Sequence, residues 1–236
     1  SGAPVVAGGG FMSADAVRAA LDALADFAVA DEPMAPHTTY RLGGPAAVYA
    51  SPRDEGELLL VGEVVRSTGL PVLVVGRGSN LLVSDDGFPG VVVTLAAFAD
   101  RLERHGTDVV ADGGAALPVV ARRTAAWGLA GFEWAVGVPG SIGGAVRMNA
   151  GGHGSDMAAC TVSVSVVDLR LGRCAEVPVE RLGLRFRGSD LADHQVVTSA
   201  RLRLAPGDVE RSESLIARSE EHTSELQSHH DLGCRL

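Results

Sequence analysis

A phosphate-binding turn is one interpretation of VVGRGSNLLV (residues 74–83), in which Gly76, Gly78, Ser79 and Asn80 end a continuous apolar run. Glycines let successive backbone N–H groups turn toward one point, and the Ser and Asn side chains add donors, so the group suits phosphate oxygens. Only two glycines are present and no long helix follows, which excludes the G-x-G-x-x-G dinucleotide fingerprint. A tight turn without a ligand is the alternative, and this motif alone does not decide between them.

A second glycine-rich stretch, GFEWAVGVPGSIGGAVRMNAGGHG, occupies residues 131–154. Its bare main chain would accommodate a flat, extended ligand, since glycine permits close approach to the backbone. Two such segments, one in each half of the chain, could hold a dinucleotide between them. A buried loop is the alternative. The glycines on which this interpretation depends are Gly137, Gly140, Gly143, Gly144, Gly151, Gly152 and Gly154.

Two arginines alternate with an aromatic residue in LRFRGSDL. On a strand, Arg185 and Arg187 would share one face and Phe186 the other. We expect Arg185 to face solvent. Arg187 precedes Gly188 and Ser189, where the strand would leave its sheet, and can offer a fixed positive fork to an anion or an enolate.

The surrounding pattern predicts the elements that position these groups. Residues 13–29 have a Ser cap and helical spacing of apolar residues, which predicts a helix. Residues 39–95 then read as strand, capped helix, apolar strand and a further strand, which indicates a small α/β unit. In the second half we expect a helix over 117–128. Three strand-like runs after it, at 161–169, 174–179 and 194–204, favour an α+β unit with a meander.

Composition restricts the class of protein. The chain has 236 residues, 46% of them hydrophobic, so it can build a sizeable core. A net charge of −9 argues against a general nucleic-acid binder. No apolar run reaches 18 residues, so we expect no membrane span, and the N-terminus lacks the features of a signal peptide. Cys160, Cys174 and Cys234 have no metal-type spacing, which favours a reduced cytoplasmic protein without a metal site.

The two ends differ from the rest of the sequence. From Ser219 the chain reads SEEHTSELQSHHDLGCRL, with no apolar period, and it resembles translated adapter sequence. We expect this segment to be foreign to the domain. Its histidines make a poor metal-ligand set. Met12 is the expected natural start, with residues 1–11 as upstream sequence.

Four stretches together resemble one protein family. They are HTTYRLGG (37–44), VVGRGSNLL (74–82), the glycine-rich 131–154 stretch and FRGSD (186–190), within a similarity that covers about residues 20–217. The family is UDP-N-acetylenolpyruvoylglucosamine reductase (MurB, UDP-N-acetylmuramate dehydrogenase), and GVPGSIGGAVRMNAG is highly specific to it. The resemblance implies an α+β fold: a two-lobed FAD-binding domain of the vanillyl-alcohol-oxidase (PCMH) type. We expect the family's third, substrate-binding domain to have no counterpart in this sequence.

The resemblance also implies a domain division. The expected segments are an N-terminal extension and helix (1–36), FAD-binding lobe 1 (37–95), FAD-binding lobe 2 (96–206), and the start of the substrate domain followed by the aberrant tail (207–236).

By resemblance, the activity is a two-stage reduction. NADPH reduces FAD, and the flavin passes a hydride to UDP-N-acetylglucosamine enolpyruvate, giving UDP-N-acetylmuramate for peptidoglycan synthesis in the cytoplasm. We expect this 236-residue chain to be inactive by itself. Two alternatives stay open: another flavin oxidoreductase of the same fold, and a non-catalytic FAD-binding fragment.

The family pattern assigns residues to these roles. Arg187, in a motif where Phe186 replaces a tyrosine, matches the arginine that stabilises the enolate-like intermediate. His153 replaces an aromatic residue in the flavin region. The expected FAD-binding residues are Tyr40, Gly76, Arg77, Gly78, Ser79, Asn80, Leu81, Gly137, Pro139, Gly140, Ser141, Gly143, Gly144, Val146 and Asn149.

Overall fold

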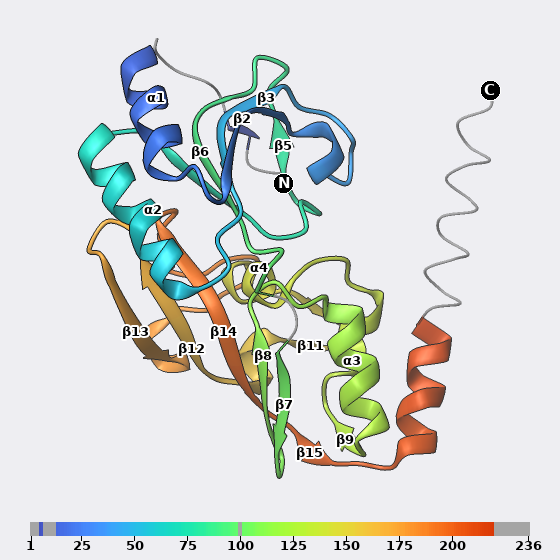
Figure 1. Cartoon of the computed structure of the whole chain (residues 1–236). Helices are drawn as coiled ribbons and strands as arrows, with labels where there is room; N and C mark the ends of the chain where they lie inside the picture. The colour runs from blue at the N-terminus through green and yellow to red at the C-terminus, as the bar shows by residue number, and fades with distance from the viewer. Residues whose placement is uncertain (1–4, 7–12, 99–100, 220–236) are drawn as a thin grey trace, which may run out of the picture.

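Two β-sheets, one in each half of the sequence, organise the chain (Figure 1). The computed structural model describes residues 5–6, 13–98 and 101–219. Most of the expected upstream segment, together with Met12, Cys234 and the tail from residue 220, lies outside the described residues. In the part that is described, no helix is long and apolar enough to cross a membrane.

The first lobe is built on a four-stranded sheet in the order β2-β3-β6-β4. Strands β3, β6 and β4 are parallel, and β2 pairs antiparallel with β3. Helix α2 connects β3 to β4. It begins where the Asp54 side chain accepts a hydrogen bond from the amide of Glu57 and ends at Gly69, so the predicted strand–helix–strand unit is confirmed. The elements of this lobe are β1 (Val5–Val6), α1 (Ala14–Ala23), β2 (Ala28–Pro33), η1 (Ala35–His37), β3 (Pro45–Ala50), α2 (Glu55–Thr68), β4 (Val72–Val75), β5 (Leu82–Val83) and β6 (Phe88–Thr94).

The first helix is shorter than predicted. It starts at the Ser13 cap but ends at Ala23 instead of residue 29, and the following residues enter the edge strand β2. The prediction was wrong because the backbone of Ala28–Pro33 is recruited by pairing with β3, a tertiary interaction that outweighs the local helical spacing.

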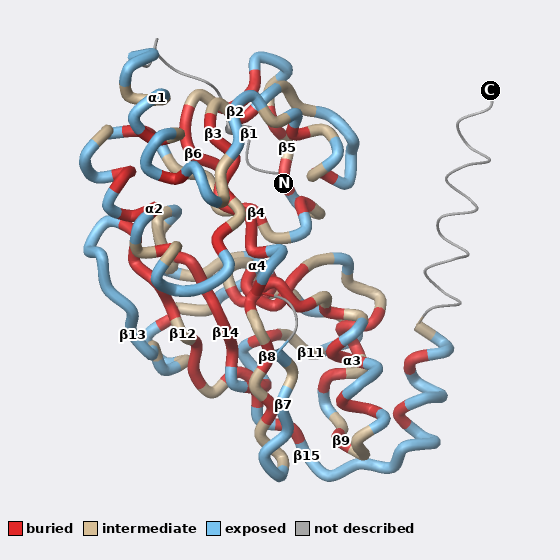
Figure 2. The backbone as a smooth tube through the Cα atoms, viewed as in Figure 1, coloured by how far each residue is buried: buried red, intermediate tan, exposed pale blue. Residues whose placement is uncertain are grey.

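The second lobe is built on a five-stranded antiparallel sheet in the order β13-β12-β14-β8-β7. The predicted meander is wrong, because β12 pairs with both β13 and β14. Strand β12 is buried along most of its length and lies inside the sheet, whereas the exposed β13 forms an edge (Figure 2). The sheet strands are β7 (Leu102–His105), β8 (Asp108–Asp112), β12 (Thr161–Asp168), β13 (Arg173–Pro178) and β14 (Gln195–Arg203).

The helices of the second lobe pack around one core with this sheet. A further helix over residues 209–219 lies beside α3 (Figure 1). The remaining elements are α3 (Leu117–Ala126), β9 (Leu129–Ala130), η2 (Glu133–Gly137), α4 (Ile142–Met148), β10 (Gly151–Gly152), β11 (Ser155–Asp156), α5 (Met157–Cys160), η3 (Val179–Arg181) and β15 (Ala205–Pro206).

The two lobes share a hydrophobic core through α2. This helix packs against β12, and a Cβ atom at Gly62 would stand 2.7 Å from the carbonyl oxygen of Leu169. The absence of a side chain therefore permits the close approach. Arg66 on the same helix donates from Nη1 to that carbonyl at 2.6 Å. The expected α+β fold is confirmed.

Candidate functional site

The two glycine-rich segments lie against each other. A Cβ atom on Gly76 would stand 2.3 Å from Oγ of Ser141, and a Cβ atom on Gly140 would stand 3.3 Å from Oγ of Ser79. Residues about 60 positions apart in the sequence are thus in van der Waals contact, where lobe 1 meets the start of α4. The predicted convergence of the two segments is confirmed.

The first segment, residues 76–81, leaves the sheet at the end of β4. Gly78 has φ +62°, and a Cβ atom there would stand only 1.9 Å from the carbonyl oxygen of His37. The amide of Thr39 donates to the carbonyl oxygen of Gly78 at 3.2 Å. Gly78 is therefore fixed by both its backbone conformation and the loop that leads into β3.

The second segment turns from η2 into α4. Gly140 has φ +148°, and Ser141 caps α4 by accepting a hydrogen bond from the amide of Gly144. A Cβ atom on Gly143 would stand 3.1 Å from the carbonyl oxygen of Val197. Gly143 therefore serves the close packing of α4 on the sheet, a structural role that the sequence did not reveal.

Several main-chain donors at this junction have no acceptor among the residues that the structure describes. Within residues 13–98 and 101–219, the amides of residues 76–81 and those of Gly140 and Ser141 donate no hydrogen bond to the protein. Such groups bind water or a ligand. Adjacent amides without acceptors at glycine-rich turns form an anion-binding concavity, so the residues present fit the diphosphate of a dinucleotide.

The remaining predicted residues fall into two groups. Tyr40, Arg77, Asn80, Pro139 and Gly144 are exposed, and Tyr40 directly follows the residue that bonds Gly78. Gly137, half-buried, closes η2.

The other group is committed to the protein interior. The side chains of Leu81 and Val146 belong to the hydrophobic cores, so only their main chain is available to a ligand. Asn149 ends α4 at φ 42°, donates from Nδ2 to Oδ2 of Asp156 at 3.0 Å, and accepts at Oδ1 from the amide of Ala158 at 2.9 Å. Its amide group is thus occupied by the fold.

Arg187 lies on a tight turn and not on a strand. The amide of Arg185 donates to the carbonyl of Gly188 at 2.9 Å, and the reverse bond is 3.1 Å, so the two residues between them form the turn. Arg187 has φ 56° and Phe186 is 90% exposed. The strand prediction was wrong because the backbone at Arg187 adopts the left-handed conformation, which no strand accommodates.

This turn is attached to α4. Oγ of Ser189 donates to the carbonyl oxygen of Arg147 at 2.7 Å, and Nη1 of Arg147 donates to the carbonyl oxygens of Leu191 and Ala192 at 3.1 and 3.0 Å. The turn therefore contacts the C-terminal end of α4, whereas Gly76 contacts its N-terminal cap. A seven-residue helix is about 10 Å long, which separates the two attachments.

A pocket of about 400 Å³ opens beside η2, and Gly131, Glu133, Trp134 and His153 of the second glycine-rich stretch help to line it. Within the described chain, Nε1 of Trp134 is buried and has no hydrogen-bond partner. His153, at φ 51°, closes one side, and the helix over residues 209–219 closes the other. The lining residues are Gly131, Glu133, Trp134, His153, Ser155, Leu215, Arg218 and Ser219.

One contributor was missed by the sequence analysis. Residues 113–115 lie alongside the second segment: the amide of Gly143 donates to the carbonyl of Gly113 at 2.7 Å, and the amide of Ile142 donates to that of Ala115 at 2.9 Å. A Cβ atom on Gly114 would stand 2.0 Å from the carbonyl of Leu95. The adjacent glycines in ADGGAALP were the available signal.

The fold and the converging glycine segments define the class: a two-lobed flavin-binding domain. Residues 46–177, more than half of the chain, match the FAD binding domain family. The similar solved structures include UDP-N-acetylenolpyruvylglucosamine reductase (MurB) from Thermus caldophilus, at a TM-score of 0.69 and 31% identity, which covers 84% of this chain and 68% of that one. The chain belongs to the UDP-N-acetylenolpyruvoylglucosamine reductase family.

Curated relatives agree with this placement. The UDP-N-acetylenolpyruvoylglucosamine reductase of Rubrobacter xylanophilus is 43% identical over 182 residues, which are 76% of this chain and 61% of the relative. That of Paramagnetospirillum magneticum is 44% identical over 177 residues, 75% and 57% of the two chains. The chain thus spans about 60% of the length of these relatives. A BBE-like protein of Physcomitrella patens, 17% identical, covers 79% of this chain and 44% of its own and shares the fold at a TM-score of 0.60.

Proposed function

We propose that this chain forms the FAD-binding lobes of an NADPH-dependent reductase that converts UDP-N-acetylglucosamine enolpyruvate into UDP-N-acetylmuramate in the cytoplasm. The observation that carries the proposal is the contact between Gly76 and Ser141, which brings two sets of unbonded amides together in a chain of this family. We propose residues 37–95 and 96–206 as the two lobes. The four-stranded sheet of the first begins earlier, at Ala28.

The diphosphate of FAD would lie against the junction where the two glycine segments meet. The amides of residues 76–81, Gly140 and Ser141 would donate to its oxygens, and the side chains of Ser79 and Asn80 would add donors. Tyr40, Arg77 and Pro139 are exposed next to these segments and would border the cofactor. When bound, FAD supplies hydride transfer between NADPH and the substrate.

Arg187 would act on the substrate. Its guanidinium group is always charged and lies 5.4 Å from the centroid of the exposed Phe186 ring, on a turn with a left-handed backbone. A cation placed where negative charge develops on the substrate stabilises the transition state, commonly by a few kcal/mol. The serine at position 189 fixes the turn to α4.

The visible absorption spectrum of the purified chain tests the proposal. Titration with FAD should give saturable flavin bands shifted from those of free FAD. Ser79→Ala combined with Asn80→Ala should weaken binding, whereas Ser67→Ala, on α2 outside the site, should not. NADPH bleaching followed by reoxidation with the enolpyruvyl nucleotide sugar would show turnover. Bands without turnover would indicate a non-catalytic FAD-binding fragment, and no binding would refute the site.

A further inference from the structure

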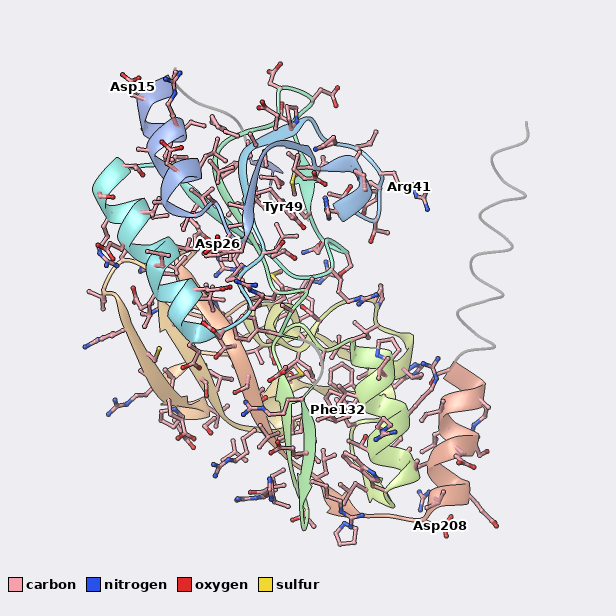
Figure 3. The ribbon with its side chains drawn as sticks, in the orientation of Figure 1. Asp15, Asp26, Arg41, Tyr49, Phe132 and Asp208 are labelled. Carbon is pink, nitrogen blue, oxygen red and sulfur yellow. The ribbon has the colours of Figure 1, made fainter. Side chains whose placement is uncertain are left out.

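A chain of polar side chains crosses the first lobe from its interior to its surface. It connects β6, β3, η1 and β2 through Thr94, Tyr49, His37 and Glu32. Oη of Tyr49 lies 3.1 Å from Nδ1 of His37, and Nε2 of His37 lies 2.9 Å from Oε1 of Glu32. The two rings have centroids 4.6 Å apart and are tilted by 31° to each other. In Figure 3 Tyr49 lies inside the lobe, whereas Arg41, on the loop after η1, points away from it.

The hydrogen bonds of this chain run in one direction. Burial raises the pKa of Tyr49, against a hydrogen bond from Thr94 that lowers it, so the phenol keeps its proton. With a neutral imidazole, the phenol donates to Nδ1 of His37 and the proton on Nε2 is donated to the carboxylate of Glu32. The imidazole is held from both sides.

His37, held in this way, contacts the first glycine segment, residues 76–81. The carbonyl oxygen of His37 occupies the space where Gly78 would carry a side chain, at 1.9 Å from that Cβ position. Two residues later, the amide of Thr39 donates to the carbonyl oxygen of Gly78. Thr38 closes the turn by bonding its hydroxyl to both main-chain groups of Leu42, at 3.0 and 3.3 Å.

The loop depends on this support. Among the described residues, the amides of residues 76–81 donate no hydrogen bond to the protein, so these amides do not help to fix the conformation of the segment. The contacts that fix Gly78 come from residues 37–39 and that for Gly76 from Ser141. Loss of the anchored imidazole would therefore weaken the contacts between residues 37–39 and Gly78.

We propose that His37 is a positioning residue for FAD binding: its anchored imidazole, without touching the cofactor, fixes the main chain that holds Gly78 in its anion-binding conformation. The inference rests on the proposed FAD site between the glycine segments. It goes beyond that site by assigning cofactor affinity to a side chain of the polar chain Thr94–Tyr49–His37–Glu32.

Three variants of the 236-residue chain test the inference. His37→Leu removes both imidazole hydrogen bonds, whereas His37→Gln retains a donor and an acceptor. Val61→Ala, a fully buried residue of α2, lowers the stability of the same lobe without contacting the loop. FAD dissociation constants come from flavin fluorescence, and unfolding free energies come from urea titration. Hydrogen exchange without FAD reports on the amide of Thr39, which donates to the carbonyl oxygen of Gly78.

We expect His37→Leu to weaken FAD binding about tenfold, which is about 1.4 kcal/mol, and to speed exchange of the Thr39 amide, which donates to Gly78. His37→Gln should recover most of the affinity, and Val61→Ala should leave affinity and local exchange unchanged. If His37→Leu fails to fold, Tyr49→Phe, which removes one bond and keeps the ring, should show a smaller loss of affinity.

Each contrary result has a different meaning. Equal loss of affinity in His37→Leu and Val61→Ala would overturn the inference, because the effect would then be lobe stability. Unaltered affinity and exchange in His37→Leu would also overturn it, while FAD binding by the unaltered chain would preserve the proposed site. Absence of FAD binding in the unaltered chain would refute the site. Unaltered exchange of the Thr39 amide in His37→Leu would then refute the positioning role as well.

Discussion

The side chain of Ser141, at the cap of α4, occupies the space where a side chain on Gly76 of the first lobe would lie. The serine Oγ is 2.3 Å from the position that a Cβ atom on the glycine would take. Ser141 is 2% exposed, so it has little room to withdraw. The junction between the lobes, and with it the proposed diphosphate site, depends on one of these two residues lacking a side chain.

A double-mutant cycle at this pair tests the relationship. Gly76→Ala should cost about 1–3 kcal/mol of unfolding free energy, because it overpacks the junction. Ser141→Ala should cost about 1 kcal/mol through loss of the helix cap. The double variant should lose less than the sum, because without Oγ the new Cβ is 3.4 Å from the nearest remaining atom, Cβ of Ser141. Urea titrations measure all three, and additive losses would contradict the contact.

Gly78 allows a second test with a matched control. Gly78 and Gly69 both have positive φ, +62° and +70°, but a Cβ on Gly69 would meet nothing within 4 Å. Gly69→Ala should therefore cost only the left-handed strain, about 1–2 kcal/mol. Gly78→Ala adds the collision with His37 and should lose FAD affinity as well as more stability. Equal unfolding free energies for the two variants would show that the loop yields without cost.

Elements with strong local patterns could be predicted from the sequence. The Asp54 cap, the apolar spacing of α2 and the continuous apolar β4 each encode their own structure. The convergence of the two glycine segments was also predictable, because bare main chain in both halves of one core implies close approach.

Features decided by tertiary pairing could not be predicted. Residues 28–33 form a strand only because β3 is available beside them, and the place of β12 between β13 and β14 depends on its pairing with both. The turn at Arg187 requires a left-handed residue that only its attachment to α4 identifies. The packing roles of Gly62 and Gly143 likewise become visible only when the carbonyl groups opposite them are in place.

The left-handed backbone at Arg187 is expected to lower the unfolding free energy of the chain. A left-handed non-glycine residue is strained by about 1–2 kcal/mol, partly offset on substitution by the greater freedom of unfolded glycine. Arg187→Gly should therefore unfold at the same or a higher urea concentration than the unaltered chain. Arg185→Gly, which removes the hydrogen bond from Nη1 to Asp190, should not stabilise the chain. A clear loss of stability in Arg187→Gly would show that the fold itself requires the arginine.

The two described cysteines should differ in reactivity. Burial raises the pKa of Cys160 to about 12 from 9.0. Desolvation and the nearby Glu55 also raise the pKa of Cys174, but this thiol is exposed on β13. Alkylation at pH 8 followed by peptide mass spectrometry should modify Cys174 and spare Cys160, because the thiolate is the nucleophile. Cys160 should react only in urea. Because its folded pKa is raised, the unfolding free energy should also fall as pH rises from 9 toward 12. Fast modification of native Cys160 would contradict its burial.

Asp168 should make the second lobe sensitive to acid. Burial raises the pKa of this carboxylate. A larger opposite effect comes from hydrogen bonds donated by the amides of Leu171 and Arg170 and by Gln195, and from the charge of His194. The net result is a pKa below 3.8. A depressed folded pKa adds stability that is present above the unfolded value. That contribution should disappear as pH falls below about 3.8 and Asp168 is protonated in the folded chain.

Asp168→Asn isolates this contribution. The Asn side chain has one oxygen where Asp168 has two, so it cannot also accept the bond from Gln195 at 3.1 Å. The variant should be about 1–3 kcal/mol less stable at pH 7. The difference should narrow below pH 3.8, because the unaltered carboxyl then loses its own charge. Asp193→Asn, at a side chain that is 88% exposed, is the control and should change stability little at either pH. A stability difference for Asp168→Asn that stays constant between pH 7 and pH 3 would show that the lost charge is not the cause.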